Sequence, residues 1–181
     1  MVTLEEYRIF TRSVSVYPKE KGTLYCSLGL QNEIGEFITT INEKKFDKQR
    51  FIKEAGDVMW YITRLMDELN IPIENQNFYS KEFEALYAFP RKEIDMDIMR
   101  YRLLEMEERL GTAYGVIKKS VRGDGKFSEV RFVDAMRSMF TSFIIILATA
   151  NVKLEQVMFE NVRKLSSRDE RGVVMGDGDD R

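Results

Sequence analysis

The sequence predicts an all-α protein, an antiparallel bundle of amphipathic helices. Apolar residues recur at spacings of three and four over long segments instead of alternating, which is the helical period. Proline occurs three times in 181 residues, and glycine is sparse before the C-terminal end, so few positions interrupt these segments. The hydrophobic fraction of 44% and the charged fraction of 32% are ordinary for a globular protein, and the length suffices for one domain with a sizeable core.

Six helices follow from this periodicity, separated by short turns rich in Pro, Gly or Asn. The turns are "VYPKEKG" after the first helix, "NIPIENQNF" after the third and "RGDGKF" after the fourth. The expected helices cover residues 3–15, 22–44, 47–69, 92–121, 127–149 and 153–167. We expect a single all-α domain over residues 1–170, made of segments 1–73, 74–149 and 150–170, with a polar tail at 171–181.

Two segments of the chain resemble each other. "NIPIENQNF" starts at residue 70 and "NVKLEQVMF" at residue 151, an offset of 151 − 70 = 81 residues. Segment 74–149 is then either a decayed copy of the first half or a set of helices with chance similarity. In a decayed copy, one half would keep the function and the other would be structural.

Absent residue types exclude several chemistries. The chain has no histidine, which removes Ser-His-Asp and Cys-His catalysis and His-ligated zinc. The lone Cys26 cannot form an intrachain disulfide, so we expect a cytoplasmic protein. The N-terminus does not read as a signal peptide, and the apolar run "FIIILATA" is too short to span a bilayer. With a net charge of −2 and mixed signs, we expect neither a membrane nor a nucleic-acid polymer as partner.

Two of the expected helices each carry a pair of carboxylates three residues apart. Glu33 and Glu36 flank the apolar stripe of the second helix, and Glu54 and Asp57 flank that of the third. Residues at this spacing are neighbours on a helix surface. The short link "EKKFDKQ" makes the two helices an antiparallel hairpin, which can bring all four carboxylates together at the edge of the core.

Such a cluster has two interpretations. Magnesium takes oxygen ligands and is commonly held by a few carboxylates together with substrate phosphates, so the cluster could be a metal site. Alternatively, the acids are solvated and pair with nearby cations such as Lys44, Lys45, Lys53 or Arg64. Spacing alone leaves both interpretations open.

The segment "YPKEKGTLYCSLGLQNEIGEF", followed by "FIKEAGDVMWYI", resembles the MazG-like all-α nucleoside triphosphate pyrophosphohydrolases, which are related to the dimeric dUTPases. That family has a Glu-Glu-x-x-Glu segment followed by Glu-x-x-Asp, and the four acids named above match its metal ligands. Asn32 departs from the pattern, because the family has its first Glu there.

The resemblance resumes near the C-terminus and covers roughly residues 5–73 and 150–181. The last helix matches an Asn-x-x-Lys-Leu-x-x-Arg pattern, and the tail matches Gly-x-Gly-Asp-x-Arg. The matching residues are Asn161, Lys164, Leu165, Arg168, Gly176, Gly178, Asp179 and Arg181.

The resemblance implies a magnesium-dependent enzyme that cleaves a nucleoside triphosphate, (d)NTP, to the monophosphate and pyrophosphate. Four acids, Glu33, Glu36, Glu54 and Asp57, would hold Mg²⁺, and Mn²⁺ could substitute for it. Glu36, together with Glu33, would orient or deprotonate the attacking water. The family is commonly dimeric, so a homodimer is expected. Two other functions stay open: a regulatory module that binds nucleotide but turns it over weakly, and a helical scaffold or interaction subunit.

Candidate substrate contacts come from the same resemblance. Lys45, Lys164, Arg168 and Arg181 are candidates for the phosphate oxygens. Alternatively, Lys45 could be a solvated helix end, and Lys164 and Arg168 could complement a helix dipole. Tyr61 and Trp60 could stack on a base, or Trp60 could be core. Asn161 could read the base or sugar, or it could bridge helices.

Overall fold

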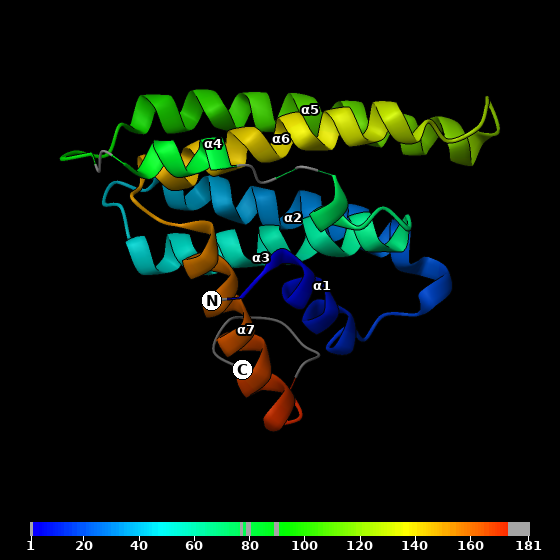
Figure 1. Cartoon of the computed structure of the whole chain (residues 1–181), viewed down its shortest axis with the longest axis horizontal. Coiled ribbons are helices and arrows are strands. Elements are labelled where there is room, and N and C mark those ends of the chain that lie inside the picture. Colours follow the sequence, from blue (N-terminus) through cyan, green and yellow to red (C-terminus); the bar gives the residue numbers. More distant parts are fainter. Residues whose placement is uncertain (1, 77, 79–80, 89–90, 174–181) are drawn as a thin grey trace. The chain divides into compact units, whose positions relative to one another are not determined.

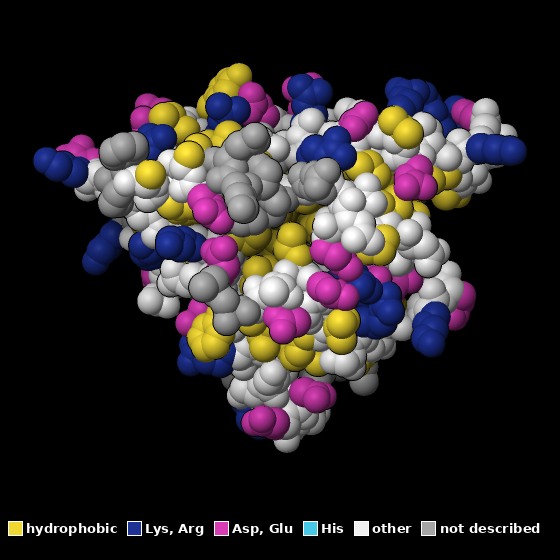
Figure 2. Space-filling model, in the orientation of Figure 1, with side chains coloured by type: hydrophobic (Ala, Val, Ile, Leu, Met, Phe, Trp, Pro, Cys, Tyr) yellow, Lys and Arg dark blue, Asp and Glu magenta, His cyan; other side chains and the backbone are white. Residues whose placement is uncertain are grey.

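The computed structural model describes residues 2–76, 78, 81–88 and 91–173, and every regular element in these ranges is a helix. This confirms the all-α prediction. The chain forms two compact units, Met1–Asn75 with Leu154–Arg181, and Gln76–Lys153. On the face shown in Figure 2, Lys and Arg side chains are interspersed with Asp and Glu, which suits the small net charge of −2.

The first unit is built around a hairpin of two helices, α2 (Gly22–Asn42) and α3 (Lys48–Glu68), which run side by side (Figure 1). Helices α1 (Leu4–Ser13) and α7 (Leu154–Glu170) come from opposite ends of the chain, and both pack against α3. Two short 3₁₀ turns, η1 (Lys19–Lys21) and η2 (Ile73–Asn75), complete the unit.

Polar side chains fix where two of these helices begin. At α1, the Thr3 hydroxyl accepts a hydrogen bond from the Glu6 N–H at 3.2 Å, and the Glu6 carboxylate accepts one from the Thr3 N–H at 2.8 Å. At α3, the Asp47 carboxylate accepts from the N–H groups of Gln49 and Arg50, at 2.9 and 3.2 Å. These contacts satisfy backbone donors that have no partner inside the helix.

The apolar stripes predicted for the hairpin form its core. On α2 and α3 the stripe residues are almost completely buried, and burial of this kind contributes roughly 1.5–3 kcal/mol for each large side chain. They are Leu30, Ile34, Phe37, Ile41, Ile52, Ala55, Met59, Ile62 and Met66. Two further residues that the sequence assigns to the stripes, Ile38 and Leu69, are only partly buried. The carboxylate pairs lie beside this stripe, so the hydrophobic periodicity places them.

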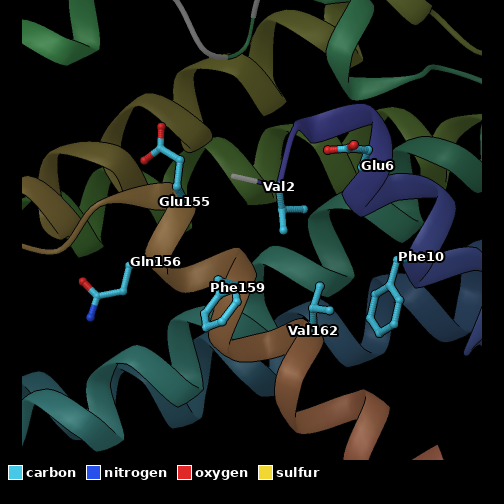
Figure 3. A pocket seen from close by; sticks show the side chains of 7 residues that line it. All are labelled: Val2, Glu6, Phe10, Glu155, Gln156, Phe159 and Val162. Carbon is cyan, nitrogen blue, oxygen red and sulfur yellow. The ribbon is translucent and has the colours of Figure 1, made fainter.

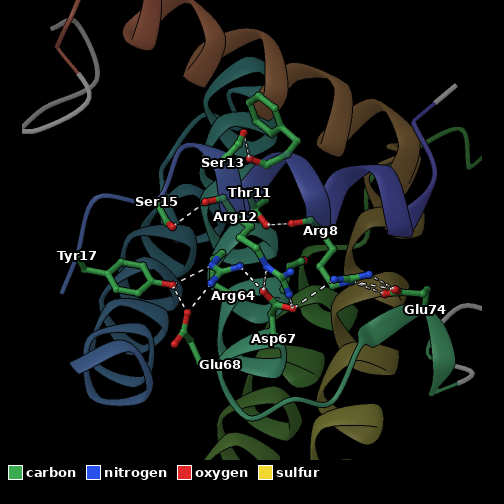
Figure 4. A network of polar contacts seen from close by, with 12 residues as sticks. Arg8, Thr11, Arg12, Ser13, Ser15, Tyr17, Arg64, Asp67, Glu68 and Glu74 are labelled. Atoms are coloured by element: carbon green, nitrogen blue, oxygen red, sulfur yellow. Dashed lines mark hydrogen bonds and ion pairs between the residues drawn. The ribbon is translucent and has the colours of Figure 1, made fainter. Parts of the chain in front are cut away.

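A network of charged side chains ties α1 to the C-terminal half of α3 (Figure 4). Asp67 is at its centre and accepts hydrogen bonds from Arg64 at 2.5 Å, from Arg12 at 2.9 Å and from Arg8 at 3.4 Å. Arg64 is only 3% exposed and also contacts Glu68. Among the described residues, the ion pairs of Arg64 are thus with Asp67 and Glu68 and not with the four predicted ligands, which the sequence offered as an alternative.

The second unit contains a longer hairpin, α5 (Met96–Arg122) and α6 (Glu129–Thr149), preceded by α4 (Lys81–Glu84) and η3 (Ala85–Tyr87). Within the described ranges, α6 is the one helix whose length and composition would allow it to cross a membrane. However, 72% of its most apolar window is buried inside the structure, as expected of a helix covered by protein.

Helices α3 and α6 end in the same hydrogen-bonded motif. Asn70 and Asn151 adopt left-handed conformations, with φ of +57° and +51°. The N–H of the residue after each asparagine donates to a carbonyl five residues back, at 2.9 Å in both cases. This is a Schellman C-cap, in which Asn tolerates the left-handed position.

The spacing of these motifs equals the offset of the sequence similarity. Helix α3 spans residues 48–68 and α6 spans 129–149, so both ends are 81 residues apart. If one segment of the chain were a copy of the other, the ends of α3 and α6 would be expected to have this same spacing. The acids are not repeated, since Ala135 and Ser138 stand 81 residues after Glu54 and Asp57.

Some boundaries differ from the prediction. Helix α7 extends to Glu170, beyond the expected helix end at 167, and Arg168 is buried in its last turn. Helix α5 starts at Met96, not at 92, since the Asp95 carboxylate caps it by accepting from two backbone N–H groups. The short helices over 81–87 were not predicted.

Candidate functional site

The hairpin of α2 and α3 brings its acidic side chains together. Glu33 and Glu36 on α2 and Glu54 on α3 each offer a carboxylate oxygen, and these oxygens all lie within 4.8 Å of one another. Glu54 is buried, with 4% of its surface exposed, whereas Glu33 is partly buried and Glu36 is exposed. The cluster therefore starts at the core and opens toward solvent.

Repulsion within the cluster is visible in the ionisation of Glu33. Its pKa is raised to about 8, first by desolvation and then by the negative charges of Asp57, Glu36 and Glu54, while Lys164 opposes the shift. The charge of Asp57 thus acts on Glu33, although Asp57 is outside the group whose oxygens lie within 4.8 Å of one another. All four predicted ligands are in one neighbourhood.

Two neighbouring side chains orient the glutamates. Asn32 donates its amide to Glu36 Oε1 at 2.9 Å, so the residue that departs from the family pattern contacts a predicted ligand. Arg50 lies one turn before Glu54, with its Nε 3.7 Å from Glu54 Oε1. Sequence reasoning missed Arg50, although its spacing of four residues from Glu54 could have indicated the contact.

Asp57 is held by helix α7. Asn161 donates its side-chain amide to Asp57 Oδ1 at 3.1 Å, and the Lys164 ammonium forms an ion pair with Asp57 Oδ2. The structure therefore brings Asn161 and Lys164, both predicted from the last helix, to the acidic cluster.

The contact between α3 and α7 is close and completely buried at Asn161. The Tyr7 hydroxyl donates to Asn161 Oδ1 at 2.8 Å and fixes the orientation of the amide. A Cβ added at Gly56 would lie 3.0–3.4 Å from Asn161 side-chain atoms, so glycine permits this approach. Sequence reasoning missed Tyr7, because no local pattern connects residues 154 positions apart.

Aromatic side chains extend the site along the same helix faces. Tyr61 follows Asp57 by one turn, and its ring fills the space in which a Cβ at Gly29 would lie, 2.0 Å from Tyr61 Cε1. The Tyr61 hydroxyl donates to the Tyr25 hydroxyl at 3.3 Å. Burial, the hydrogen bond to Tyr25 and the charge of Glu33 all raise the pKa of Tyr61, so its phenol stays protonated.

Trp60 packs edge-on against Tyr61, with ring centroids 4.7 Å apart. Its ring is partly buried, and the indole Nε1 is a buried donor without a hydrogen-bond partner among the described residues. Trp60 is thus neither fully in the core nor a free surface ring.

Two of the other predicted contacts, Lys45 and Arg168, lie in the described part of the chain. Lys45 is exposed in the connection between α2 and α3. Arg168 is on α7 and is buried, with 5% of its surface exposed, so its guanidinium is not displayed to solvent. Arg181 lies outside the described residues, as do Gly176, Gly178 and Asp179.

A separate hollow lies on the other side of α7 (Figure 3). It measures about 610 Å³, and its lining combines apolar side chains of α1 and α7 with polar ones at the rim. The lining residues are Val2, Glu6, Phe10, Glu155, Gln156, Phe159 and Val162. Phe159 and Asn161 are two positions apart on a helix and so face opposite ways, which separates this hollow from the acidic cluster.

Removing the charge of Glu33 should stabilise the metal-free protein. An acid whose pKa rises on folding destabilises the folded state as the pH increases from its ordinary value of 4.5 to about 8. The Glu33→Gln variant should therefore unfold at higher denaturant in EDTA at pH 8, by ~1–2 kcal/mol after allowing for solvent screening, and show little gain at pH 4.5. The control is Glu20→Gln, the same substitution at an exposed position of η1. An equal gain in stability at both pH values, or the same gain in the control, would contradict the placement of Glu33 in the cluster.

The donor set suits a hard divalent cation. Carboxylate oxygens are the ligands that Mg²⁺ prefers, and a cation among three of them would oppose both the desolvation and the repulsion that raise the pKa of Glu33. Lys164 and the aromatic rings lie beside this position, where an anionic ligand with an apolar part could be held. No family model, no curated protein and no solved structure matches the chain.

Proposed function

We propose that the protein is a magnesium-dependent nucleoside triphosphate pyrophosphohydrolase of the MazG-like type. The observation that carries this proposal is the convergence of Glu33, Glu36 and Glu54 within 4.8 Å, with Asp57 beside them, on one helical hairpin. Four carboxylates in one place destabilise a protein that does not use them. The Asn161 and Lys164 contacts add support, because they join the second part of the family resemblance to the first.

The proposed reaction is hydrolysis between the α and β phosphates. Bound magnesium would neutralise the triphosphate and lower the pKa of a coordinated water. The water oxygen bonds to the α-phosphorus, the bond from that phosphorus to the bridging oxygen breaks, and pyrophosphate leaves with the electron pair. Glu36 is exposed at the open side of the cluster, where its carboxylate can accept the proton of the water.

The residues around the cluster have distinct roles in this proposal. Glu33 and Glu54 would hold the cation from the buried side, and Asn32 orients the Glu36 carboxylate through its amide. Lys164 supplies a positive charge for phosphate oxygens. Tyr61 and Tyr25 present aromatic surface next to Glu33, on which a base can stack.

A panel of canonical nucleoside triphosphates, with dUTP and dCTP included, tests this function. The proposal predicts release of one pyrophosphate and one monophosphate per triphosphate consumed, dependent on Mg²⁺ and abolished by EDTA. Release of inorganic phosphate in place of pyrophosphate would assign another reaction. Nucleotide binding that needs Mg²⁺ but gives no product across the panel would favour the regulatory-module alternative.

A further inference from the structure

Asp57 differs from the three glutamates of the cluster in the groups that contact its carboxylate. Glu33, Glu36 and Glu54 offer carboxylate oxygens within 4.8 Å of one another, and Asn32 and Arg50, which contact Glu36 and Glu54, come from the hairpin itself. Asp57 instead receives donors from α7 on both of its oxygens, and one of these donors is a cation. Lys164 Nζ contacts Oδ2, and the Asn161 amide contacts Oδ1. The Lys164 and Asp57 side chains are only 14% and 20% exposed, so water screens their attraction weakly.

We propose that Lys164 is a built-in cation at the Asp57 position, which must leave before a divalent ion can bind there. This inference rests on the metal site of the proposed function. It makes the cluster a site of two unequal parts: one formed by the three glutamates and open to a first ion, and one at Asp57 that is closed by Lys164.

Electrostatics explain why the two cations exclude each other. A divalent ion on Asp57 Oδ2 would lie within a few ångströms of the Lys164 ammonium, and like charges at that distance repel strongly in a partly buried site. Without a metal, the same ammonium pairs with Asp57 Oδ2 and so brings one positive charge to the acidic cluster. In the metal-free protein, Lys164 thus supplies some of the positive charge that a second ion would supply at Asp57.

Only the lysine side chain has to move. The α7 backbone is fixed by Asn161, which is 2% exposed, accepts from the Tyr7 hydroxyl and packs against Gly56. The lysine stem has four rotatable methylene groups and can turn its ammonium to another anion nearby. A triphosphate held at the three glutamates by a cation would be such an anion, and Lys164 would then leave Asp57 when nucleotide binds.

The number of Mn²⁺ ions bound per chain tests whether Lys164 excludes a second ion. The electron paramagnetic resonance signal gives the concentration of free Mn²⁺, and the bound amount follows by difference. The wild-type chain should bind one Mn²⁺ without nucleotide and a second only when the α,β-imido analogue of dUTP or dCTP is present. Lys164→Met should bind the second Mn²⁺ without nucleotide, about tenfold or more tightly than the wild type does.

Arg163→Met is the matched control, since Arg163 is 73% exposed, pairs with Glu160 and carries the same charge. It should bind Mn²⁺ like the wild type, and Lys164→Arg, which keeps the cation, should do so as well. Lys164→Gln repeats the neutral substitution with a polar side chain, should Lys164→Met fold poorly by circular dichroism. Two ions on the nucleotide-free wild type, or unchanged binding in both neutral variants, would overturn the proposal.

The two proposals can fail separately. If no triphosphate gives pyrophosphate but the neutral variants gain an Mn²⁺, the function is wrong and the role of Lys164 holds. If the wild type hydrolyses nucleotide and the neutral variants gain no ion, the function holds and the role of Lys164 is wrong.

Discussion

Replacing Glu54 with glutamine should lower magnesium-dependent pyrophosphate release by about 100-fold or more. Glu54 is the most buried member of the cluster, and its oxygen shares a 4.8 Å neighbourhood with those of Glu33 and Glu36. The amide keeps the size of the side chain but loses the negative charge that holds a divalent cation. Initial rates of wild type and Glu54→Gln, measured at saturating Mg²⁺ with the best triphosphate of the panel, give the ratio.

The matched control is Glu5→Gln, an identical substitution at an exposed position of α1. It should retain the wild-type rate. Circular dichroism should show that Glu54→Gln is folded, because removing one of several clustered charges relieves repulsion. A Glu54→Gln variant with full magnesium-dependent activity would show that this carboxylate does not hold the cation.

Replacing Asp67 with asparagine should lower the free energy of unfolding by about 3 kcal/mol. Asp67 accepts hydrogen bonds from Arg8, Arg12 and Arg64, and Arg64 is only 3% exposed (Figure 4). Asparagine would leave the buried guanidinium with less counter-charge, and breaking a buried pair from one side is strongly destabilising. Urea denaturation of the two proteins at pH 7 gives the difference.

Asp134→Asn is the control, because Asp134 is exposed and pairs with Arg137 at the surface. Its substitution should change the free energy of unfolding by less than about 1 kcal/mol. If Asp134→Asn lowered the free energy of unfolding as much as Asp67→Asn does, burial of the ion pair would not explain the effect of Asp67.

The effect of Asp67 should also depend on pH in a defined direction. Burial opposes ionisation, but hydrogen bonds and charges from Arg12 and Arg64 outweigh it and lower the pKa of Asp67 below 3.8. A depressed pKa contributes stability above the ordinary value, and this contribution is lost as the pH falls through the folded-state pKa. The difference in the free energy of unfolding between wild type and Asp67→Asn should therefore become smaller below pH 4.

Local patterns were sufficient to predict the hairpin and its acids. The apolar stripes through Leu30 and Ile62 place both helices correctly, because a helical period of three and four residues fixes which face is buried. The short connection between the helices then makes them antiparallel neighbours. Glu33 and Glu54 converge for these two local reasons alone.

Contacts across the chain could not be predicted in the same way. The Lys164 ion pair with Asp57 joins residues 107 positions apart, and the Tyr7 contact with Asn161 joins residues 154 apart. No periodicity sets the angle at which α7 meets α3. The family resemblance indicated that Asn161 and Lys164 matter, but not that both of them hold Asp57.

The central claim is that the three glutamates hold a divalent cation, and diffraction from crystals grown with Mn²⁺ tests it most directly. The anomalous signal of manganese should give a peak in direct contact with the carboxylates of Glu33, Glu36 and Glu54, and the peak should vanish in Glu54→Gln crystals. A map in which these carboxylates point apart into solvent, with manganese elsewhere or nowhere on the chain, would contradict the claim.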